Sequence, residues 1–342
     1  MRTAPSLRSS RHAAAFRAGR AGFAFLTLLS LIFAAFVERQ SPVAALVVLL
    51  LCTGSIGIFH GVLDVVLLTL PRQFTPQQAL LATQPGFRNA VWLRLSAYGL
   101  AVVALLVVLG SQPAWAMVAL LVMSAWHFGE VFSDSLHRGH SVWWYRAGER
   151  LTLGAASVAL PRLIQSESLY EIVSLICGPN PAAMSLVWQA WTLLAVVWLV
   201  VGTLWFLAST VRLLRSNFDD QETKSLAKSL RWAALHTVLL TLVYALVSPV
   251  MGFALYFGLY HSPAHVLRVI RAYPTGFTVA IRWQLGAVYA LTLVLAALTF
   301  QWVTASRFEF LMSSSLLQTY VIVITAISLP HIFLVSQRAD EL

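Results

Sequence analysis

Charged residues are scarce in this sequence: they make up 11% of its 342 residues, whereas an average soluble domain contains about 25%. Cysteine is scarcer still, with only Cys52 and Cys177, and neither a Cys-x-x-Cys pair nor a dinucleotide-binding glycine motif occurs. The low charge excludes ordinary soluble domains, because their surfaces need more polar side chains than this chain has. The two cysteines exclude a disulfide framework, and the missing motifs give no support to dithiol, flavin or nicotinamide chemistry.

Apolar side chains fill the sequence instead, at 59% of the residues, and the mean hydropathy is +0.77. Apolar runs of about 20 residues recur, and a helix of that length crosses a hydrocarbon core of roughly 30 Å. We therefore expect an all-α fold, a polytopic integral membrane helix bundle. The ten predicted spans are at about residues 21–37, 42–70, 91–110, 113–133, 151–165, 184–213, 231–249, 251–271, 283–304 and 316–336.

The basic residues support this span count. With the N-terminus inside, 20 of the 23 Lys and Arg residues fall in inner segments, which follows the positive-inside rule. Both termini of this multi-pass protein are then expected in the cytoplasm. The net charge of +10 lies in short loops rather than along one stripe, so we expect no nucleic-acid partner.

Two segments deviate from this regular pattern. The fifth span is the weakest, because Pro161 and Arg162 interrupt it, and a half-span or an interfacial helix is an alternative. Residues 1–20 contain five arginines and no acid, which predicts a basic cytoplasmic tail. Residues 21–337 are expected to form a single transmembrane helical domain.

Histidines are placed unevenly along the predicted spans. Three of the nine lie in the tail or in an inner loop. At helical rise, the other six lie at roughly 7–15 Å from the cytoplasmic boundary, so they share one level of the bundle. Ionisable side chains at membrane depth are costly and normally face the bundle interior with a partner. These six are His60, His127, His236, His261, His265 and His331.

Their spacing predicts a metal site. His261 and His265 are four residues apart, so both imidazoles project from one face of a helix. Imidazoles that converge from several helices are how metal sites are built in bundle cores, and neutral imidazole suits iron, copper, zinc and nickel. For His236, which has no such neighbour, we expect a hydrogen-bonded structural role.

Acidic and aromatic residues accompany the histidines. Asp64 shares a helix face with His60, and we expect it to accept a hydrogen bond from an imidazole rather than to bind metal. Glu130 follows His127 by three residues and fits either a similar role or a solvated position near the interface. Five aromatic residues have two interpretations: they line a tunnel for an apolar substrate, or they pack between helices. They are Trp126, Phe128, Tyr256, Phe257 and Tyr260.

Four segments resemble the conserved motifs of the bacteriorhodopsin-related-protein-like (Brp/Blh) family. IFHGVLD at 58–64 resembles the HGxxD element, and AWHFGE at 125–130 resembles the WHFG element. YHSPAH at 260–265 resembles the HSxxH element, and LPH at 329–331 resembles the PH element. Each motif is short, but all four occur in the family's order across about residues 45–336.

The resemblance implies a β-carotene 15,15′-dioxygenase, which uses Fe(II) and O₂ to split the central double bond into two all-trans-retinal molecules. By motif position it implies His60, His127, His261 and His265 as the iron ligands. Asp64 and His331 are then expected beside the ligands or in the substrate pocket, as are Glu130, Tyr260, Trp126 and Phe257. The expected partners are β-carotene or a related carotenoid, O₂ and the lipid bilayer.

Three other functions use similar residues. A diiron membrane hydroxylase or desaturase would need about eight histidines in HxxxH and HxxHH clusters, whereas this sequence has one HxxxH and no HxxHH. A bis-histidine haem b protein would show a Soret absorption band. A transporter or proton pathway would use Asp64, Glu130 and the histidines as a relay and would form no product from carotene.

Overall fold

The computed structural model describes most of the chain. It covers residues 57–69, 85–133, 143–215, 221–272, 279–305 and 312–337, together with Ala35 and Cys52. The predicted tail at 1–20, the span at 21–37 and the first part of the span at 42–70 lie outside these ranges, apart from those two residues. Every regular element within the described ranges is helical, which confirms the all-α prediction.

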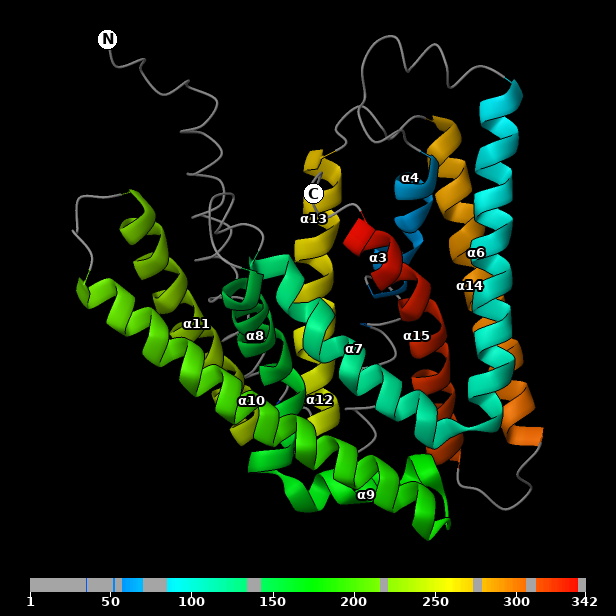
Figure 1. Cartoon of the computed structure of the whole chain (residues 1–342). Coiled ribbons are helices and arrows are strands. Elements are labelled where there is room, and N and C mark those ends of the chain that lie inside the picture. The colour runs from blue at the N-terminus through cyan, green and yellow to red at the C-terminus, as the bar shows by residue number, and fades with distance from the viewer. Residues whose placement is uncertain are drawn as a thin grey trace, which may run out of the picture.

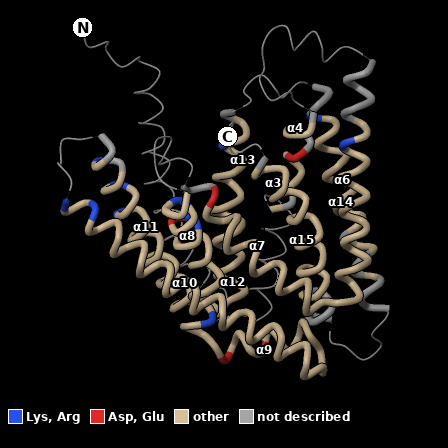
Figure 2. Tube along the Cα trace, viewed as in Figure 1, with Lys and Arg blue, Asp and Glu red and all other residues tan. Residues whose placement is uncertain are grey.

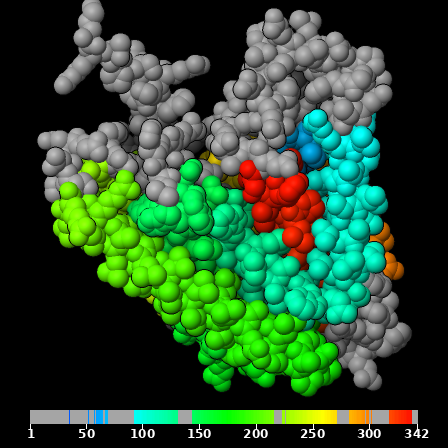
Figure 3. Space-filling view, in the orientation of Figure 1, coloured from blue at the N-terminus to red at the C-terminus, as the bar shows by residue number. Residues whose placement is uncertain are grey.

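The helices form one layered bundle (Figure 1). The first half contains α3 (Ile58–Val62), α4 (Asp64–Thr69), α6 (Pro85–Ser111), α7 (Pro113–Ser133), α8 (Trp143–Ile164), α9 (Ser166–Cys177) and α10 (Pro181–Arg215). The second half contains α11 (Gln221–Leu246), α12 (Pro249–Leu255), the π-helix η2 (Tyr256–His261), α13 (Ser262–Ala272), α14 (Val279–Ala305) and α15 (Met312–Gln337). Figure 3 shows α7 and α15 between α6 and α10 on one face of the molecule.

The surface of the bundle suits a lipid environment. Four helices of the described chain are long and apolar enough to cross a membrane, at Trp92–Ser111, Pro181–Arg215, Leu226–Leu246 and Leu317–Ser336. Large apolar side chains are exposed along them, such as Leu100 (71%) and Leu204 (61%). Contiguous exposed apolar surface of this kind is costly in water, which supports the prediction of a membrane protein.

The fifth predicted span differs most from the structure. α8 begins at Trp143, eight residues before the expected start, because Tyr145 and Glu149 are buried against neighbouring helices although they are polar. The segment after it forms a separate amphipathic helix, α9, which buries Leu169, Val173 and Ile176 and exposes Glu167 on the other face. Hydropathy alone misses both features, because it averages the buried and exposed faces.

Two glycines let α7 and α8 cross at close range. A Cβ atom on Gly129 would lie 1.9 Å from the backbone oxygen of Arg150, and one on Gly154 would lie 2.4 Å from that of Ala125. Only the absence of side chains permits such an approach. The glycine of the WHFG segment therefore brings α8 against the helix that carries His127.

Side chains satisfy the backbone of α8 around its proline. Pro161 has no N–H to donate to the Ser157 carbonyl oxygen four residues earlier, and the Tyr244 hydroxyl donates to that oxygen instead, at 2.8 Å. His236 also contacts the backbone of α8, with its Nε2 at 3.2 Å from the Leu153 carbonyl oxygen. This contact agrees with the structural role expected for His236.

Charged residues gather at one end of the bundle (Figure 2). α10 ends in Arg212 and Arg215, and α8 carries Arg146 and Arg150 in its first two turns. Arg162 lies at the opposite end of α8. The middle of the described helices is largely without Lys and Arg, as the span prediction requires.

Candidate metal centre

Five histidines, each from a different helical element, converge in the bundle core. His60 on α3 lies at the centre, with its ring centroid 4.3–5.9 Å from the other four. The exposed fraction of each residue is 4% or less. The convergence predicted from depth and spacing is therefore present. The other members of the cluster are His127 on α7, His261 at the end of η2, His265 on α13 and His331 on α15.

Most nitrogens of this cluster make no hydrogen bond to any residue that the structure describes. Among the described residues, Nδ1 of His60, Nε2 of His127 and both ring nitrogens of His261 and His265 make no hydrogen bond. A buried polar atom without a partner costs about 1–3 kcal/mol, so six of them in one place need an explanation. A bound cation explains one nitrogen of each of the four imidazoles, because the lone pair of that nitrogen then has an electron acceptor.

The distances between the ligand atoms fit a metal ion. One group of ligand nitrogens comes from His60, His265 and His331, and another comes from His60, His127 and His261. Within each group the nitrogens lie within 4.8 Å of one another. An all-imidazole, carboxylate-free set of ligands suits a transition metal rather than calcium or magnesium.

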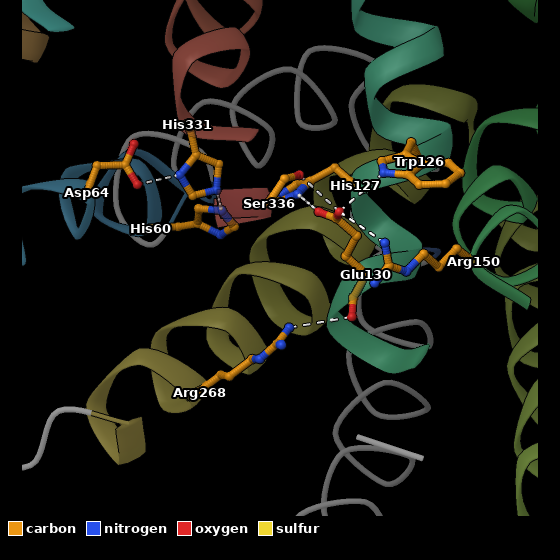
Figure 4. A network of polar contacts seen from close by, with 9 residues as sticks. All are labelled: His60, Asp64, Trp126, His127, Glu130, Arg150, Arg268, His331 and Ser336. Atoms are coloured by element: carbon orange, nitrogen blue, oxygen red, sulfur yellow. Dashed lines mark hydrogen bonds and ion pairs between the residues drawn. The ribbon is translucent and has the colours of Figure 1, made fainter. Parts of the chain in front are cut away.

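Asp64 holds one of the histidines in place. Its Oδ1 accepts a hydrogen bond from Nδ1 of His331 at 2.6 Å, and its Oδ2 accepts one from the Tyr98 hydroxyl on α6 at 2.6 Å. His331 in turn places Nε2 at 2.8 Å from Nε2 of His60 (Figure 4). Sequence spacing predicted that Asp64 and His60 would share a face, but Tyr98 could not be found, because no local pattern links α6 to this site.

Glu130 contacts a second histidine of the cluster and has three further side-chain partners. Its carboxylate lies 3.3 Å from Nδ1 of His127 and accepts hydrogen bonds from Trp126 at 3.2 Å and Ser336 at 3.1 Å. Arg150 makes an ion pair with it at 3.5 Å (Figure 4). Glu130 is only 2% exposed, so the alternative of a solvated interfacial position is wrong. A buried carboxylate needs such partners.

The π-helix η2 brings an aromatic wall to the histidines. A π-turn widens the helix and changes the direction of the following side chains, and such turns are frequent at functional sites. Phe257 stacks on His261 at 5.9 Å between ring centroids and 15° between planes, and Phe128 approaches His261 at 4.4 Å. One side of the cluster is therefore apolar and aromatic.

Two predicted pocket residues lie elsewhere. Tyr260 packs beside His236, with ring centroids 5.5 Å apart, and lines a separate cavity with Tyr256 and Trp232. Trp126 donates to Glu130 and does not line the cavity at the histidines. Tyr260 precedes His261 in the sequence but projects in another direction from the helix, so adjacency was a poor guide to its position.

Two cavities adjoin in the core. The first has a volume of about 30 Å³ and is lined by three of the histidines and by Phe257. The second, of about 80 Å³, lies between α7, α8, α9, α12 and α15 and is lined almost entirely by apolar side chains. Leu120, Ser124 and Phe253 line both cavities. Together they form a narrow apolar seam from the histidines toward α9.

One comparison with known proteins identifies the family. The family model described as beta-carotene 15,15′-dioxygenase matches residues 51–337, which is more than four fifths of the chain. The matched region includes all five clustered histidines, Asp64 and Glu130. No curated protein and no solved structure matches the chain.

Proposed function

The chain belongs to the β-carotene 15,15′-dioxygenase family, and on that premise we propose that it cleaves the central double bond of β-carotene with O₂ to give two retinal molecules. The reaction is balanced without a reductant, because the broken carbon–carbon double bond supplies the electrons and each half receives one oxygen atom. The missing flavin and nicotinamide motifs agree with this stoichiometry.

The observation that carries the proposal is the set of buried imidazole nitrogens without partners. Four histidines carry them: His60, His127, His261 and His265. We propose that these residues hold Fe(II), because neutral imidazoles suit iron and nothing else described in the core satisfies their lone pairs. When bound, iron supplies the site at which O₂ is activated next to the polyene.

The protein's own groups prepare this site. Asp64 and Glu130 each lie at Nδ1 of an imidazole, which fixes the tautomer and directs Nε2 into the cluster. The aromatic wall of Phe128 and Phe257 covers one side of the histidines and excludes water. A dry, preorganised site strengthens electrostatic interactions and protects reactive species from water.

We propose that one half of the substrate lies in the apolar seam. β-Carotene is a symmetric hydrocarbon without hydrogen-bonding groups, and a cavity lined by apolar side chains matches its chemistry. The seam begins at the histidines and runs toward α9, so the position of the polyene along it would set which double bond reaches the metal. Its small volume means that side chains such as Leu120 and Phe253 must move as the polyene binds.

Blocking the junction of the two cavities is expected to lower retinal formation without loss of iron. Leu120 is 8% exposed and lines both cavities, so Leu120→Trp should reduce turnover of β-carotene at least tenfold by filling the seam. Val122→Trp is the matched control, because Val122 lies on the same helix with 59% of its surface exposed. Equal activity of the two variants would contradict the assignment of the seam. Iron per chain and retinal are measured on both.

We also propose an orientation in the bacterial cell membrane. The basic end of the bundle, with Arg146, Arg150, Arg212 and Arg215, would face the cytoplasm under the positive-inside rule. The histidine cluster lies nearer to this end, since His331 is six residues from the end of α15. Residues 21–337 would form a single membrane domain, which a carotenoid reaches from the bilayer.

The function is tested by expression in bacteria that accumulate β-carotene. We expect the carotene to be consumed and retinal to appear as the sole cleavage product by chromatography. Unequal apocarotenals would contradict central cleavage, and hydroxylated carotenes would instead indicate a membrane hydroxylase. Cells that carry the empty vector give the background.

A further inference from the structure

We propose that His331 is a fifth protein ligand of the metal and that Asp64 and Tyr98 orient it. This inference rests on the proposed iron site and extends the set of four ligands that the family motifs imply. It assigns direct coordination to a side chain that the sequence placed only beside the metal. The three residues come from α15, α4 and α6, so the proposal also explains how these elements are tied to the centre.

The tautomer of His331 leaves Nε2 without a proton. Nδ1 donates a hydrogen bond to Oδ1 of Asp64 at 2.6 Å, and the Tyr98 hydroxyl donates one to Oδ2 and orients the carboxylate. Neutral imidazole has a single N–H, so Nε2 of His331 is a free lone pair that points toward His60. In a buried site this lone pair must meet a proton from His60 or a metal ion.

The distance between the two Nε2 atoms fits a hydrogen bond and a shared metal ion alike, and the grouping of the ligand nitrogens favours the metal, since those of His60, His265 and His331 lie within 4.8 Å of one another. The two Nε2 atoms lie 2.8 Å apart. Metal–imidazole bonds are about 2.1 Å long, so two neighbouring ligands at a right angle lie about 3 Å apart. The separation is thus close to that of two ligands of one ion. His331 also lies within reach of His127 and His265, at 5.0 Å and 5.1 Å between ring centroids.

His331 repeats the arrangement of His127. In both residues Nδ1 faces a buried carboxylate, Asp64 for one and Glu130 for the other, and Nε2 faces the cluster. A carboxylate behind an imidazole is the usual support of a metal-binding histidine. The closer of these two pairs is that of His331, at 2.6 Å against 3.3 Å. A residue supported in this way is expected to bind the metal as directly as its counterpart.

The proposed reaction leaves room for a fifth ligand. A polyene hydrocarbon has no heteroatom that binds iron, so only O₂ requires a free coordination position. Five imidazoles around a six-coordinate ion leave one such position.

Metal binding without substrate tests this inference. The whole chain, purified without metal in detergent, is titrated with Fe(II) against a chelator, and Co(II) is used as a spectroscopic probe. For His331→Ala we expect iron affinity to fall more than about 100-fold, as for loss of a direct ligand. The visible absorption of the cobalt form should become more intense, because four-coordinate cobalt absorbs more strongly than five- or six-coordinate cobalt. Asp64→Asn, which acts through His331, should lose about tenfold in affinity.

The controls separate this inference from the proposed function. His236→Ala removes a buried imidazole outside the cluster and should leave iron affinity and the cobalt spectrum unchanged. His331→Ala with wild-type affinity and spectrum would overturn the fifth ligand while the iron site stands. A wild-type chain that binds no iron would overturn both. If His331→Ala does not fold, the cobalt spectrum of the wild type decides alone, and an intense four-coordinate spectrum would contradict the proposal.

Discussion

Replacing His261 with alanine is expected to abolish both iron binding and retinal formation. His261 is fully buried, and its ring lies 5.0 Å from His60 and 5.1 Å from His127, so it belongs to the cluster. Neither of its ring nitrogens has a described hydrogen-bond partner, which leaves metal binding as its contribution. We expect less than a tenth of an iron per chain and a fall in retinal of more than about 100-fold.

His236 provides the matched control for this variant. It is 3% exposed, but its Nε2 contacts the Leu153 carbonyl oxygen rather than the cluster. His236→Ala should retain iron and lose only stability, by about 1 kcal/mol for the lost hydrogen bond and by more for the cavity that the buried imidazole leaves. Full activity of His261→Ala, or equal iron loss in both variants, would contradict the assignment of the ligands. Iron is measured by elemental analysis and folding by gel filtration.

Adding one methyl group to Gly129 is expected to have the largest effect on stability. The new Cβ would lie 1.9 Å from the backbone oxygen of Arg150, and backbone cannot move aside as a side chain does. Gly129→Ala should therefore push α8 away from α7 and destabilise the fold by about 3 kcal/mol. The displacement also moves His127 and Glu130, which lie within two residues of Gly129 on α7, so we expect iron to be lost together with stability.

Gly99→Ala is the control for this substitution. Nothing lies within 4 Å of a Cβ built on Gly99, which is on the outer face of α6. Alanine favours helix over glycine by about 0.5–1 kcal/mol, so this variant should be as stable as the wild type or slightly more stable. Thermal unfolding in detergent compares the two variants. A Gly129→Ala midpoint equal to that of Gly99→Ala would show that the close crossing is absent.

The position of the metal centre could be predicted from sequence because it depends on local rules. The spacing of His261 and His265 places both on one helix face, and helical rise places the histidines of different spans at one level. In the structure, His261 and His265 both lie against His60 in one buried cluster, as these two rules led us to expect.

What could not be predicted depends on contacts between distant segments. Tyr98 and Arg150 support Asp64 and Glu130 from helices far away in the sequence, and no periodicity links them. The charge of Arg150 was counted only as a sign of membrane orientation. α9 was missed because its apolar face is narrow and its exposed acids lower the mean hydropathy. Tyr260 was misplaced because neighbours in sequence project in different directions from a helix.

Metal and product measured on one preparation test the central claim most directly. The purified chain, loaded anaerobically with Fe(II), is given β-carotene and O₂, and iron per chain and retinal per carotene are determined together. The account predicts one iron per chain and two retinal molecules for each β-carotene consumed, with no turnover before iron is added. Two irons per chain, a haem spectrum, or carotene consumed without retinal would contradict it.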